Sequence, residues 1–237
     1  MNEIKLYLLD IEGTVAPVAF VTETLFAYGR KHFPEFLRQH ALDPAVSGDL
    51  RLLSEENSRE TATDCPTLGI EIANIAEAQT YIDWLMDRDR KSTALKSLQG
   101  RVWKSGYESG ELRSALYDDV PRAFARWAQQ ARVAIYSSGS TDAQRLFFKY
   151  SDHGDLTPHI SGYFDTRTGP KQAGASYAAI AEAMEVEPAQ VLFFSDVVKE
   201  LDAAREAGCH TRLVVRAGNG PVIDANGHLS IESLSGI

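Results

Sequence analysis

The sequence has few of the features that mark secreted, membrane-spanning or disulfide-stabilised proteins. It contains only two cysteines, Cys65 and Cys209, among 237 residues, and two thiols provide neither a disulfide framework nor a zinc cage. No run approaches the roughly 20 uncharged apolar residues that a membrane helix needs. The first five residues lack the basic and then apolar order of a secretory signal. These absences predict a protein of the reducing cytoplasm with no membrane partner.

Positive charge is also scarce. The chain has 24 Lys and Arg against 33 Asp and Glu, which gives a formal net charge of −9. Nucleic acids and anionic membrane surfaces are bound through clustered positive charge, so we expect neither as a partner. The rest of the composition, 44% hydrophobic and 24% charged, is typical of a folded globular protein.

Short apolar runs that end in polar residues recur along the chain. Runs of this length and composition are typical of buried strands, and they span residues 4–9, 133–136, 191–194 and 213–215. Between them, apolar residues recur every three or four positions in 120–127 and 177–184, which predicts helices. This alternation predicts an α/β fold, a doubly wound parallel sheet with helices on both faces.

The long stretch between the first two strand runs has a different pattern. Residues 20–117 show helical faces and no strand-like runs. We therefore predict that residues 20–117 form an inserted helical cap domain, and that residues 1–19 and 118–237 together form the α/β core. If the core holds an active site, closure of the insertion over it would exclude water, and opening would release a product.

Glycine and serine mark two segments that we expect to be loosely held. Gly100, Gly106 and Gly110 cluster near the end of the insertion, which predicts a mobile loop that returns to the sheet. The tail from Gly218 to Ile237 is rich in glycine and serine, and we expect it to pack loosely.

Acidic and hydroxyl side chains follow the predicted strands at the points where those strands end. They are Asp10 and Glu12 after run 4–9, Ser137 and Ser138 after run 133–136, and Asp196 after run 191–194, with Glu200 a helical turn further on. Ligands of open parallel sheets bind at the carboxyl ends of the strands, so these side chains are expected to converge. Converging carboxylates repel each other unless a cation lies between them, and oxygen ligands favour Mg²⁺. Mg²⁺ in turn commonly partners a phosphate.

The residue types at the first two strand ends suit the hydrolysis of a phosphate ester. Asp10 is a candidate nucleophile that attacks phosphorus and becomes an aspartyl phosphate. If the backbone is extended here, the side chains of Asp10 and Glu12 point to the same side. Glu12 is then a candidate for proton transfer to the leaving oxygen and from the attacking water. Ser137 and Ser138 precede a predicted helix, whose first backbone N–H groups bind phosphate oxygens.

Charge balance suggests roles for three further residues. Lys171 follows the turn residues 168–170 and is a candidate to neutralise the remaining negative charge. Asp196 is a candidate metal ligand, while Glu200 either orients the water shell of the metal or is structural. Three residues of the insertion either contact the substrate or belong to the core of the cap: Trp103, Lys104 and Tyr107.

The order of these motifs resembles that of the haloacid dehalogenase superfamily of phosphohydrolases. The first motif of that superfamily is Asp-x-Asp, whereas here the second acid is Glu12. A glutamate at this position makes the chain similar to the enolase-phosphatases of methionine salvage. The similarity extends from the first strand to about Gly218. The similarity is carried by Asp10-Ile11-Glu12-Gly13-Thr14 with Pro17 and Phe20, Tyr136-Ser137-Ser138-Gly139-Ser140, Ala143-Gln144, Tyr163-Phe164-Asp165-Thr166, and Leu98-Gln99-Gly100 with Trp103.

The resemblance implies a Rossmannoid HAD-like core with a helical cap, a small phosphorylated diketone as substrate, and one Mg²⁺ per subunit. Similar enzymes enolise 2,3-diketo-5-methylthiopentyl-1-phosphate and then remove its phosphate, which leaves the acireductone 1,2-dihydroxy-3-keto-5-methylthiopentene. Their pattern places metal contacts on the Asp10 carboxylate, the Glu12 backbone carbonyl and Asp196. It places phosphate contacts on Ser137, Ser138 and Lys171. Similar enzymes are often monomeric, and we expect a monomer here.

Other functions remain open at the level of sequence. One alternative is a capped phosphatase of the same superfamily that acts on another small phosphorylated metabolite, and a substrate panel separates the two. Another is a catalytically silent binding module of the same fold, which would retain ligand without turnover. A dehalogenase would use the same aspartate against carbon but would require neither Glu12 nor Mg²⁺. The base for enolisation is either Glu12 or a residue of the cap.

Overall fold

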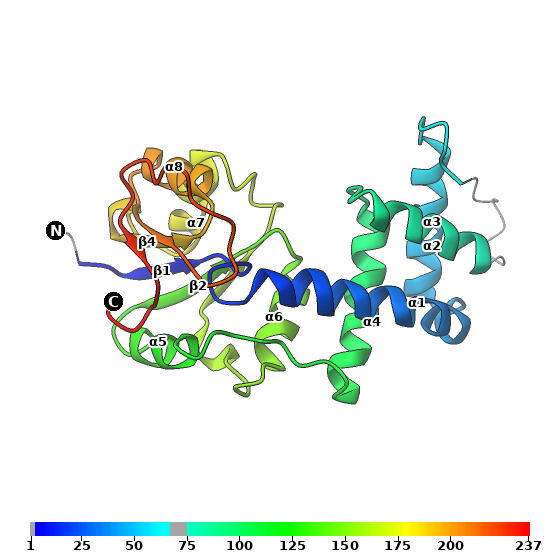
Figure 1. The fold of residues 1–237 in the computed structure, drawn as a ribbon, viewed down its shortest axis with the longest axis horizontal. Helices are drawn as coiled ribbons and strands as arrows, with labels where there is room; N and C mark the ends of the chain where they lie inside the picture. Colours follow the sequence, from blue (N-terminus) through cyan, green and yellow to red (C-terminus); the bar gives the residue numbers. More distant parts are fainter. Residues whose placement is uncertain (1–2, 67–74) are drawn as a thin grey trace. The chain divides into compact units, whose positions relative to one another are not determined.

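The computed structural model describes residues 3–66 and 75–237. The chain divides into two compact units (Figure 1). The first unit combines the two ends of the chain, Met1–Thr22 and Arg113–Ile237, and the second comprises Glu23–Leu112. The first unit contains every strand of the described residues, and the second is helical.

The first unit is built on a parallel sheet of six strands in the order β3-β2-β1-β4-β5-β6. The strands are β1 (Leu6–Leu9), β2 (Arg132–Tyr136), β3 (Gly162–Phe164), β4 (Val191–Ser195), β5 (His210–Val214) and β6 (Ser230–Ile231). The helices of this unit are α5 (Val120–Trp127), α6 (Thr141–Lys149), η2 (Thr157–His159), α7 (Gly174–Ala183), η3 (Pro188–Gln190) and α8 (Val198–Glu206).

Alternating side chains of β1 are buried on the two faces of the sheet. Leu6 and Leu8 are fully buried in the hydrophobic cluster that also contains residues of α7 and α8. Tyr7 points to the other face and stacks on Trp127 of α5, with ring centroids 4.3 Å apart. In Figure 1, α7 and α8 lie on one side of the strands and α5 on the other. This arrangement confirms the predicted α/β fold with helices on both faces of a parallel sheet.

The predicted strands are confirmed with small changes at their ends, but two short strands were not predicted. β3 has three residues and β6 has two, so neither offers enough apolar sequence to be recognised locally. The prediction that the tail packs loosely is wrong for its C-terminal part, although residues 220–224 are exposed. β6 pairs with β5, and Leu234 is fully buried.

The second unit consists of helices around its own apolar core. They are α1 (Phe26–His40), α2 (Pro44–Ser58), α3 (Ile75–Asp87) and α4 (Thr93–Ser109), and η1 (Phe20–Leu25), a π-helix, precedes α1. Phe33, Leu37 and Leu98 are fully buried in this core. Across residues 3–66 and 75–237, no helix combines the length and apolar character that crossing a membrane requires.

The prediction of a mobile, glycine-rich loop in the insertion is wrong. Gly100 and Gly106 lie inside α4, and Gly110 ends that helix with φ +82°. A Cβ on Gly106 would come within 2.6 Å of the Tyr28 ring. This glycine therefore serves close packing between α4 and α1, which the sequence alone does not distinguish from a turn.

Candidate functional site

The candidate site lies where the order of the strands reverses. The chain builds outward from β1 through β2 to β3 and then returns to place β4 on the other side of β1. Leu9, the last residue of β1, pairs with Ile135 of β2 and Phe194 of β4. The residues that follow these strands therefore stand level with one another at their carboxyl ends. Ligands of doubly wound sheets bind at this kind of switch point.

Asp10 follows β1 and is 3% exposed. Its backbone N–H continues the pairing with β4 by donating to Phe194 O at 3.0 Å. Its carboxylate oxygen Oδ1 accepts the Ile11 N–H at 2.7 Å and contacts Lys171 Nζ, also at 2.7 Å. The oxygen Oδ2 takes part in neither contact. One oxygen of this buried carboxylate is thus fixed by the protein, which holds the other in a defined position.

Lys171 lies between two buried carboxylates. Its Nζ is 2.7 Å from Asp10 Oδ1 and 2.7 Å from Glu200 Oε2. Burial alone would lower the pKa of Lys171, but the charges of these two carboxylates outweigh burial and raise it. Glu200 Oε2 also accepts a hydrogen bond from Ser195 Oγ at 3.0 Å. Glu200 is therefore a direct partner of Lys171 and holds the ammonium group against Asp10.

Two more carboxylates belong to the same electrostatic cluster. Burial raises the pKa of Glu12 to about 7, and the negative charge of Asp10 adds to this increase. Burial also raises the pKa of Asp196 to about 6, again with a contribution from Asp10. Gly13 follows Glu12 in the loop, and a Cβ at Gly13 would lie 2.2 Å from Asp196 Oδ2. The Asp10 loop and Asp196 are thus packed directly against each other.

The donor chemistry of this cluster fits a magnesium ion. Asp10 and Glu200 contact the Lys171 ammonium group, and Glu12 and Asp196 interact with it electrostatically. Burial, with the charge of Asp10, raises the pKa values of Glu12, Asp196 and Glu200. Within the described residues, no group of three or more His, Cys, Asp or Glu side chains has the arrangement of a metal cage. Mg²⁺ typically uses one or two carboxylates and keeps several waters. Two carboxylates with a backbone carbonyl therefore suit it.

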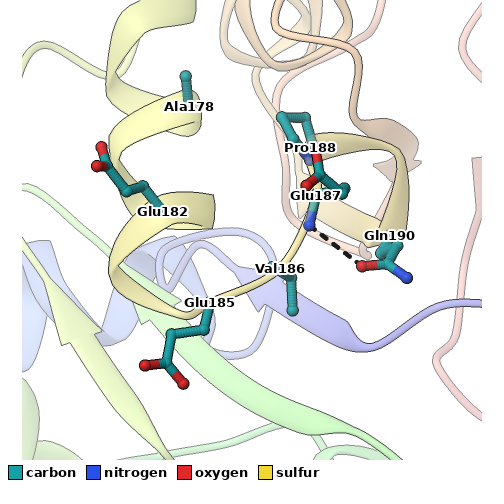
Figure 2. A pocket seen from close by; sticks show the side chains of 7 residues that line it. All are labelled: Ala178, Glu182, Glu185, Val186, Glu187, Pro188 and Gln190. Carbon is teal, nitrogen blue, oxygen red and sulfur yellow. Dashed lines mark hydrogen bonds between the residues drawn. The ribbon is translucent and has the colours of Figure 1, made fainter.

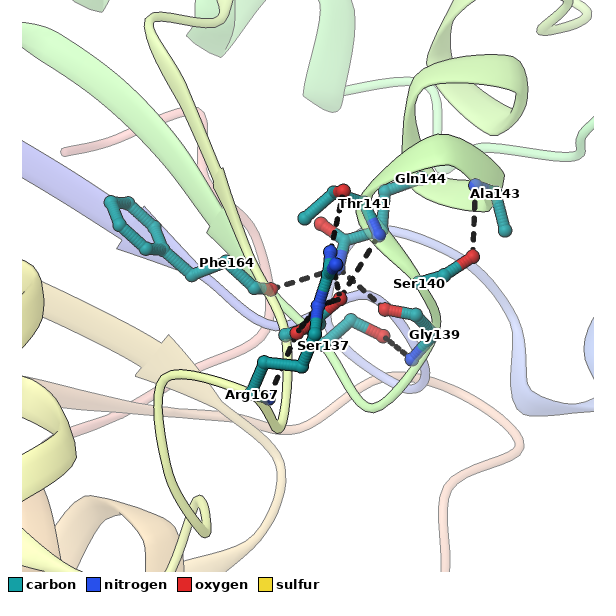
Figure 3. A network of polar contacts seen from close by, with 9 residues as sticks. Ser137, Gly139, Ser140, Thr141, Ala143, Gln144, Phe164 and Arg167 are labelled. Atoms are coloured by element: carbon teal, nitrogen blue, oxygen red, sulfur yellow. Dashed lines mark hydrogen bonds and ion pairs between the residues drawn. The ribbon is translucent and has the colours of Figure 1, made fainter. Parts of the chain in front are cut away.

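The segment after β2 has the features of a phosphate-binding loop (Figure 3). Ser137 is 2% exposed, and its Oγ accepts the Gly139 N–H at 3.2 Å. Ser138 is exposed. Ser140 caps α6 by accepting the Ala143 N–H at 3.3 Å, so a helix follows these serines as predicted. Backbone N–H groups at such a helix start bind phosphate oxygens.

Gln144, which is not among the predicted site residues, supports this loop. Its Nε2 donates to Gly139 O and to Phe164 O, each at 2.8 Å, and joins the loop to the end of β3 (Figure 3). Asp165 accepts the Thr141 N–H at 3.3 Å and binds Arg167. Gln144 lies in the first turn of the helix that follows the serine-rich loop. A side-chain amide at that position is the sequence signal that points to it.

The candidates of the cap are divided between its interior and its surface. Trp103 and Tyr107 are 9% and 2% exposed, and Trp103 Nε1 donates to Leu25 O at 2.9 Å within the same unit. Lys104 lies on the surface with Glu108, at 3.8 Å. The two aromatic residues thus contribute to the packing of the helical unit.

A surface pocket of about 380 Å³ lies elsewhere on the first unit (Figure 2). It is lined by residues at the end of α7 and around η3, among them Glu182, Glu185 and Glu187. Gln190, another lining residue, immediately precedes β4. The pocket therefore lies at the amino end of that strand, whereas Asp196 follows its carboxyl end. Its acidic lining is unsuited to an anionic phosphate.

Comparisons with known proteins identify the family of this chain. The family model of haloacid dehalogenase-like hydrolases matches residues 4–208. Enolase-phosphatase E1 of Synechococcus elongatus is 54% identical over 91% of this chain and 90% of that protein. Enolase-phosphatase E1 of Pseudomonas fluorescens is 43% identical over 99% of this chain and 97% of that protein. The crystal structure of the UTR4 protein from Saccharomyces cerevisiae is similar with a TM-score of 0.79 and 38% identity, covering 98% of both chains. The chain therefore belongs to the haloacid dehalogenase-like hydrolases and, within them, to the enolase-phosphatases.

Proposed function

We propose that this enolase-phosphatase acts in methionine salvage through an aspartyl phosphate formed on Asp10. The substrate is 2,3-diketo-5-methylthiopentyl-1-phosphate, which is first enolised and then dephosphorylated to the acireductone 1,2-dihydroxy-3-keto-5-methylthiopentene. The observation that supports this proposal most directly is the buried Asp10 carboxylate at the switch point. Its Oδ1 is held by the Ile11 N–H and Lys171, and we assign the attack on phosphorus to Oδ2.

The proposed chemical steps use groups that lie close to Asp10. Asp10 Oδ2 forms a bond to phosphorus while the bond from phosphorus to the substrate oxygen breaks. Glu12, whose pKa is about 7, donates a proton to that departing oxygen because an appreciable fraction of it is protonated near neutral pH. Glu12 then accepts a proton from the water that cleaves the aspartyl phosphate. Inorganic phosphate leaves, and Asp10 and Glu12 return to their starting states.

Three groups are assigned to the phosphate of the substrate. Ser137 and Ser138 precede the start of α6, where backbone N–H groups favour an anion. Lys171 supplies positive charge beside Asp10 and offsets part of the charge that the phosphate brings in. Glu200 keeps Lys171 in this place.

We assign the magnesium contacts to the Asp10 carboxylate, the Glu12 backbone carbonyl and Asp196, with one ion per chain. The ion would supply positive charge for the phosphoryl oxygens and polarise a carbonyl during enolisation. The base for enolisation stays open between Glu12 and a residue of the cap.

The remaining assignments concern the organisation of the protein. We propose residues 1–19 and 118–237 as the catalytic core, which contains all seven assigned site residues, and residues 20–117 as the cap. We also propose a monomer in the cytoplasm. Cys65 and Cys209 are both free thiols, in keeping with a reducing compartment.

The test gives the purified protein the diketo phosphate with Mg²⁺ and follows phosphate release and enediol absorbance. Acid quenching during turnover of substrate labelled in its phosphate should trap label on the protein, and Asp10→Asn should abolish this trapping. Glu182→Gln, which removes an exposed carboxylate from the surface pocket, is the matched control and should trap label normally. Absence of metal-dependent turnover would remove the proposal. Equal kcat/KM for unrelated sugar phosphates would instead indicate a general phosphatase.

A further inference from the structure

The C-terminal tail is hydrogen-bonded to the loop that carries Asp10 and Glu12. Asn219 Nδ2 donates to Gly13 O at 2.9 Å, and Arg216 Nε donates to Thr14 O at 3.1 Å. Both contacts join residues that are more than 200 positions apart in the chain. All four residues belong to the first unit.

Asn219 supplies one of the two hydrogen bonds that hold the Gly13–Thr14 peptide group. The Gly13 N–H donates to Ala16 O at 2.8 Å inside the loop. Because a peptide bond is planar, this bond orients the Glu12 carbonyl, which shares its peptide plane with that N–H. The next peptide plane contains the Thr14 N–H, which donates to Ile11 O at 3.2 Å inside the loop, and Gly13 O, which accepts the shorter bond of 2.9 Å from Asn219 in the tail. These bonds together orient both peptide planes that flank Gly13.

The conformation of Gly13 makes the bond from Asn219 important. Gly13 has φ +68°, a left-handed conformation that glycine adopts about as readily as the right-handed one. Glycine itself therefore does little to select this conformation, and the bonds to its neighbours do. A Cβ at Gly13 would lie 2.2 Å from Asp196 Oδ2 and 3.1 Å from Asn219 Nδ2, so the carboxylate and the amide pack against the same side of Gly13.

Asn219 is half-buried, but its Oδ1 is buried without a hydrogen-bond partner in the described part of the chain. An unpaired buried polar atom is unfavourable. An apolar residue at position 219 would avoid that cost, but it could not donate to Gly13 O.

We propose that Asn219 is a positioning residue for the reaction. Its amide holds the Gly13–Thr14 peptide and thereby keeps the Glu12 carbonyl and Asp196 in the relative positions that bind Mg²⁺. This inference rests on the proposed function, because it takes Glu12 and Asp196 as magnesium contacts. Groups that orient the ligands of a metal typically change metal affinity or activity by about 10–100-fold when removed.

The test compares Asn219→Ala and Asn219→Leu with the unaltered protein. Leucine has a similar size to asparagine but cannot donate a hydrogen bond. We expect Mg²⁺ binding to the substrate-free protein, measured by titration calorimetry, to weaken by at least about 10-fold in both variants. At limiting Mg²⁺, kcat should fall by a similar factor while KM changes less than about threefold. Raising the Mg²⁺ concentration should restore much of kcat, which a loss of folding would not allow.

Ser233→Ala is the matched control. It removes another hydrogen bond of the tail, from Ser233 Oγ to Asp119 Oδ2 at 2.8 Å, and leaves the Asn219 contact intact. We expect it to bind Mg²⁺ as the unaltered protein does. Circular dichroism checks that each variant folds. If the leucine variant does not fold, Mg²⁺ binding by Asn219→Ala is the test.

The outcomes separate this inference from the proposed function. Mg²⁺ binding within about threefold of the unaltered protein in a folded Asn219 variant would overturn the inference, as would an equal loss in Ser233→Ala. Absence of Mg²⁺ binding in the unaltered protein would also overturn it. If the unaltered protein binds Mg²⁺ but does not convert the diketo phosphate, the proposed function fails. Weaker Mg²⁺ binding in Asn219→Ala would still support the positioning role in that case.

Discussion

Replacing Gly13 with alanine tests the packing of the Asp10 loop against Asp196. The new Cβ would be 2.2 Å from Asp196 Oδ2 and 2.6 Å from its carboxyl carbon, so the carboxylate must move by about 1 Å to reach van der Waals distance. Alanine at φ +68° also costs about 1–2 kcal/mol relative to glycine. A displacement of this size at a reacting centre costs roughly 100-fold in rate. We therefore expect kcat to fall by about two orders of magnitude, with weaker Mg²⁺ binding.

Gly154→Ala separates the displacement of Asp196 from backbone strain. Gly154 has φ +87°, and a Cβ there would meet nothing within 4 Å. This variant should lose about 1–2 kcal/mol of unfolding free energy and keep its kcat. Phosphate release at saturating and limiting Mg²⁺ and chemical denaturation measure the two effects. If Gly13→Ala keeps kcat and Mg²⁺ affinity within threefold of the unaltered protein, the assignment of Asp196 beside this loop to the metal site is refuted.

Three further substitutions test charges in the first unit. Asp10→Asn should abolish phosphate release and leave the circular dichroism spectrum unchanged, because an amide does not form the acyl phosphate; substantial residual release would contradict a covalent role. Lys171→Met leaves Asp10 and Glu200 as neighbouring buried carboxylates, so denaturation should show a loss of about 3–5 kcal/mol, and a loss below about 1 kcal/mol would argue against the bridge. Burial opposes ionisation of Asp119, but hydrogen bonds led by that from Arg216 outweigh it and lower the pKa of Asp119 below 3.8. The stability that this carboxylate contributes is therefore present above about pH 4 and disappears as pH falls through its folded pKa. The difference in unfolding free energy between the unaltered protein and Asp119→Asn should shrink on acidification, and a difference independent of pH would refute this assignment.

The buried strands could be predicted from sequence because burial on both faces requires continuous apolar runs. Such runs preceded Asp10, Ser137 and Asp196, and the parallel fold then required these residues to share one edge of the sheet. Local sequence was sufficient because each strand and the polar residue after it are adjacent in the chain.

Segments whose structure depends on distant partners were predicted wrongly. The tail contains few apolar residues in a row, but pairing with β5 and burial of Leu234 fix it in place. Gly106 belongs to a cluster of glycines, which is typical of a turn, yet it lies inside α4. A glycine is needed there because the Tyr28 ring occupies the space of a side chain. In both places a contact with a distant residue determines the local conformation.

At the site, local sequence specifies which chemical groups are available and which strand each one follows. The partners of those groups depend on the fold. Lys171 is predicted as a charge that neutralises an anion, and folding places it between Asp10 and Glu200. No local pattern marks Asn219, whose role depends on its bond to Gly13 O. A hydrogen bond or ion pair requires distances of about 3 Å in space, and separation along the chain does not encode such distances for residues brought together by the sheet.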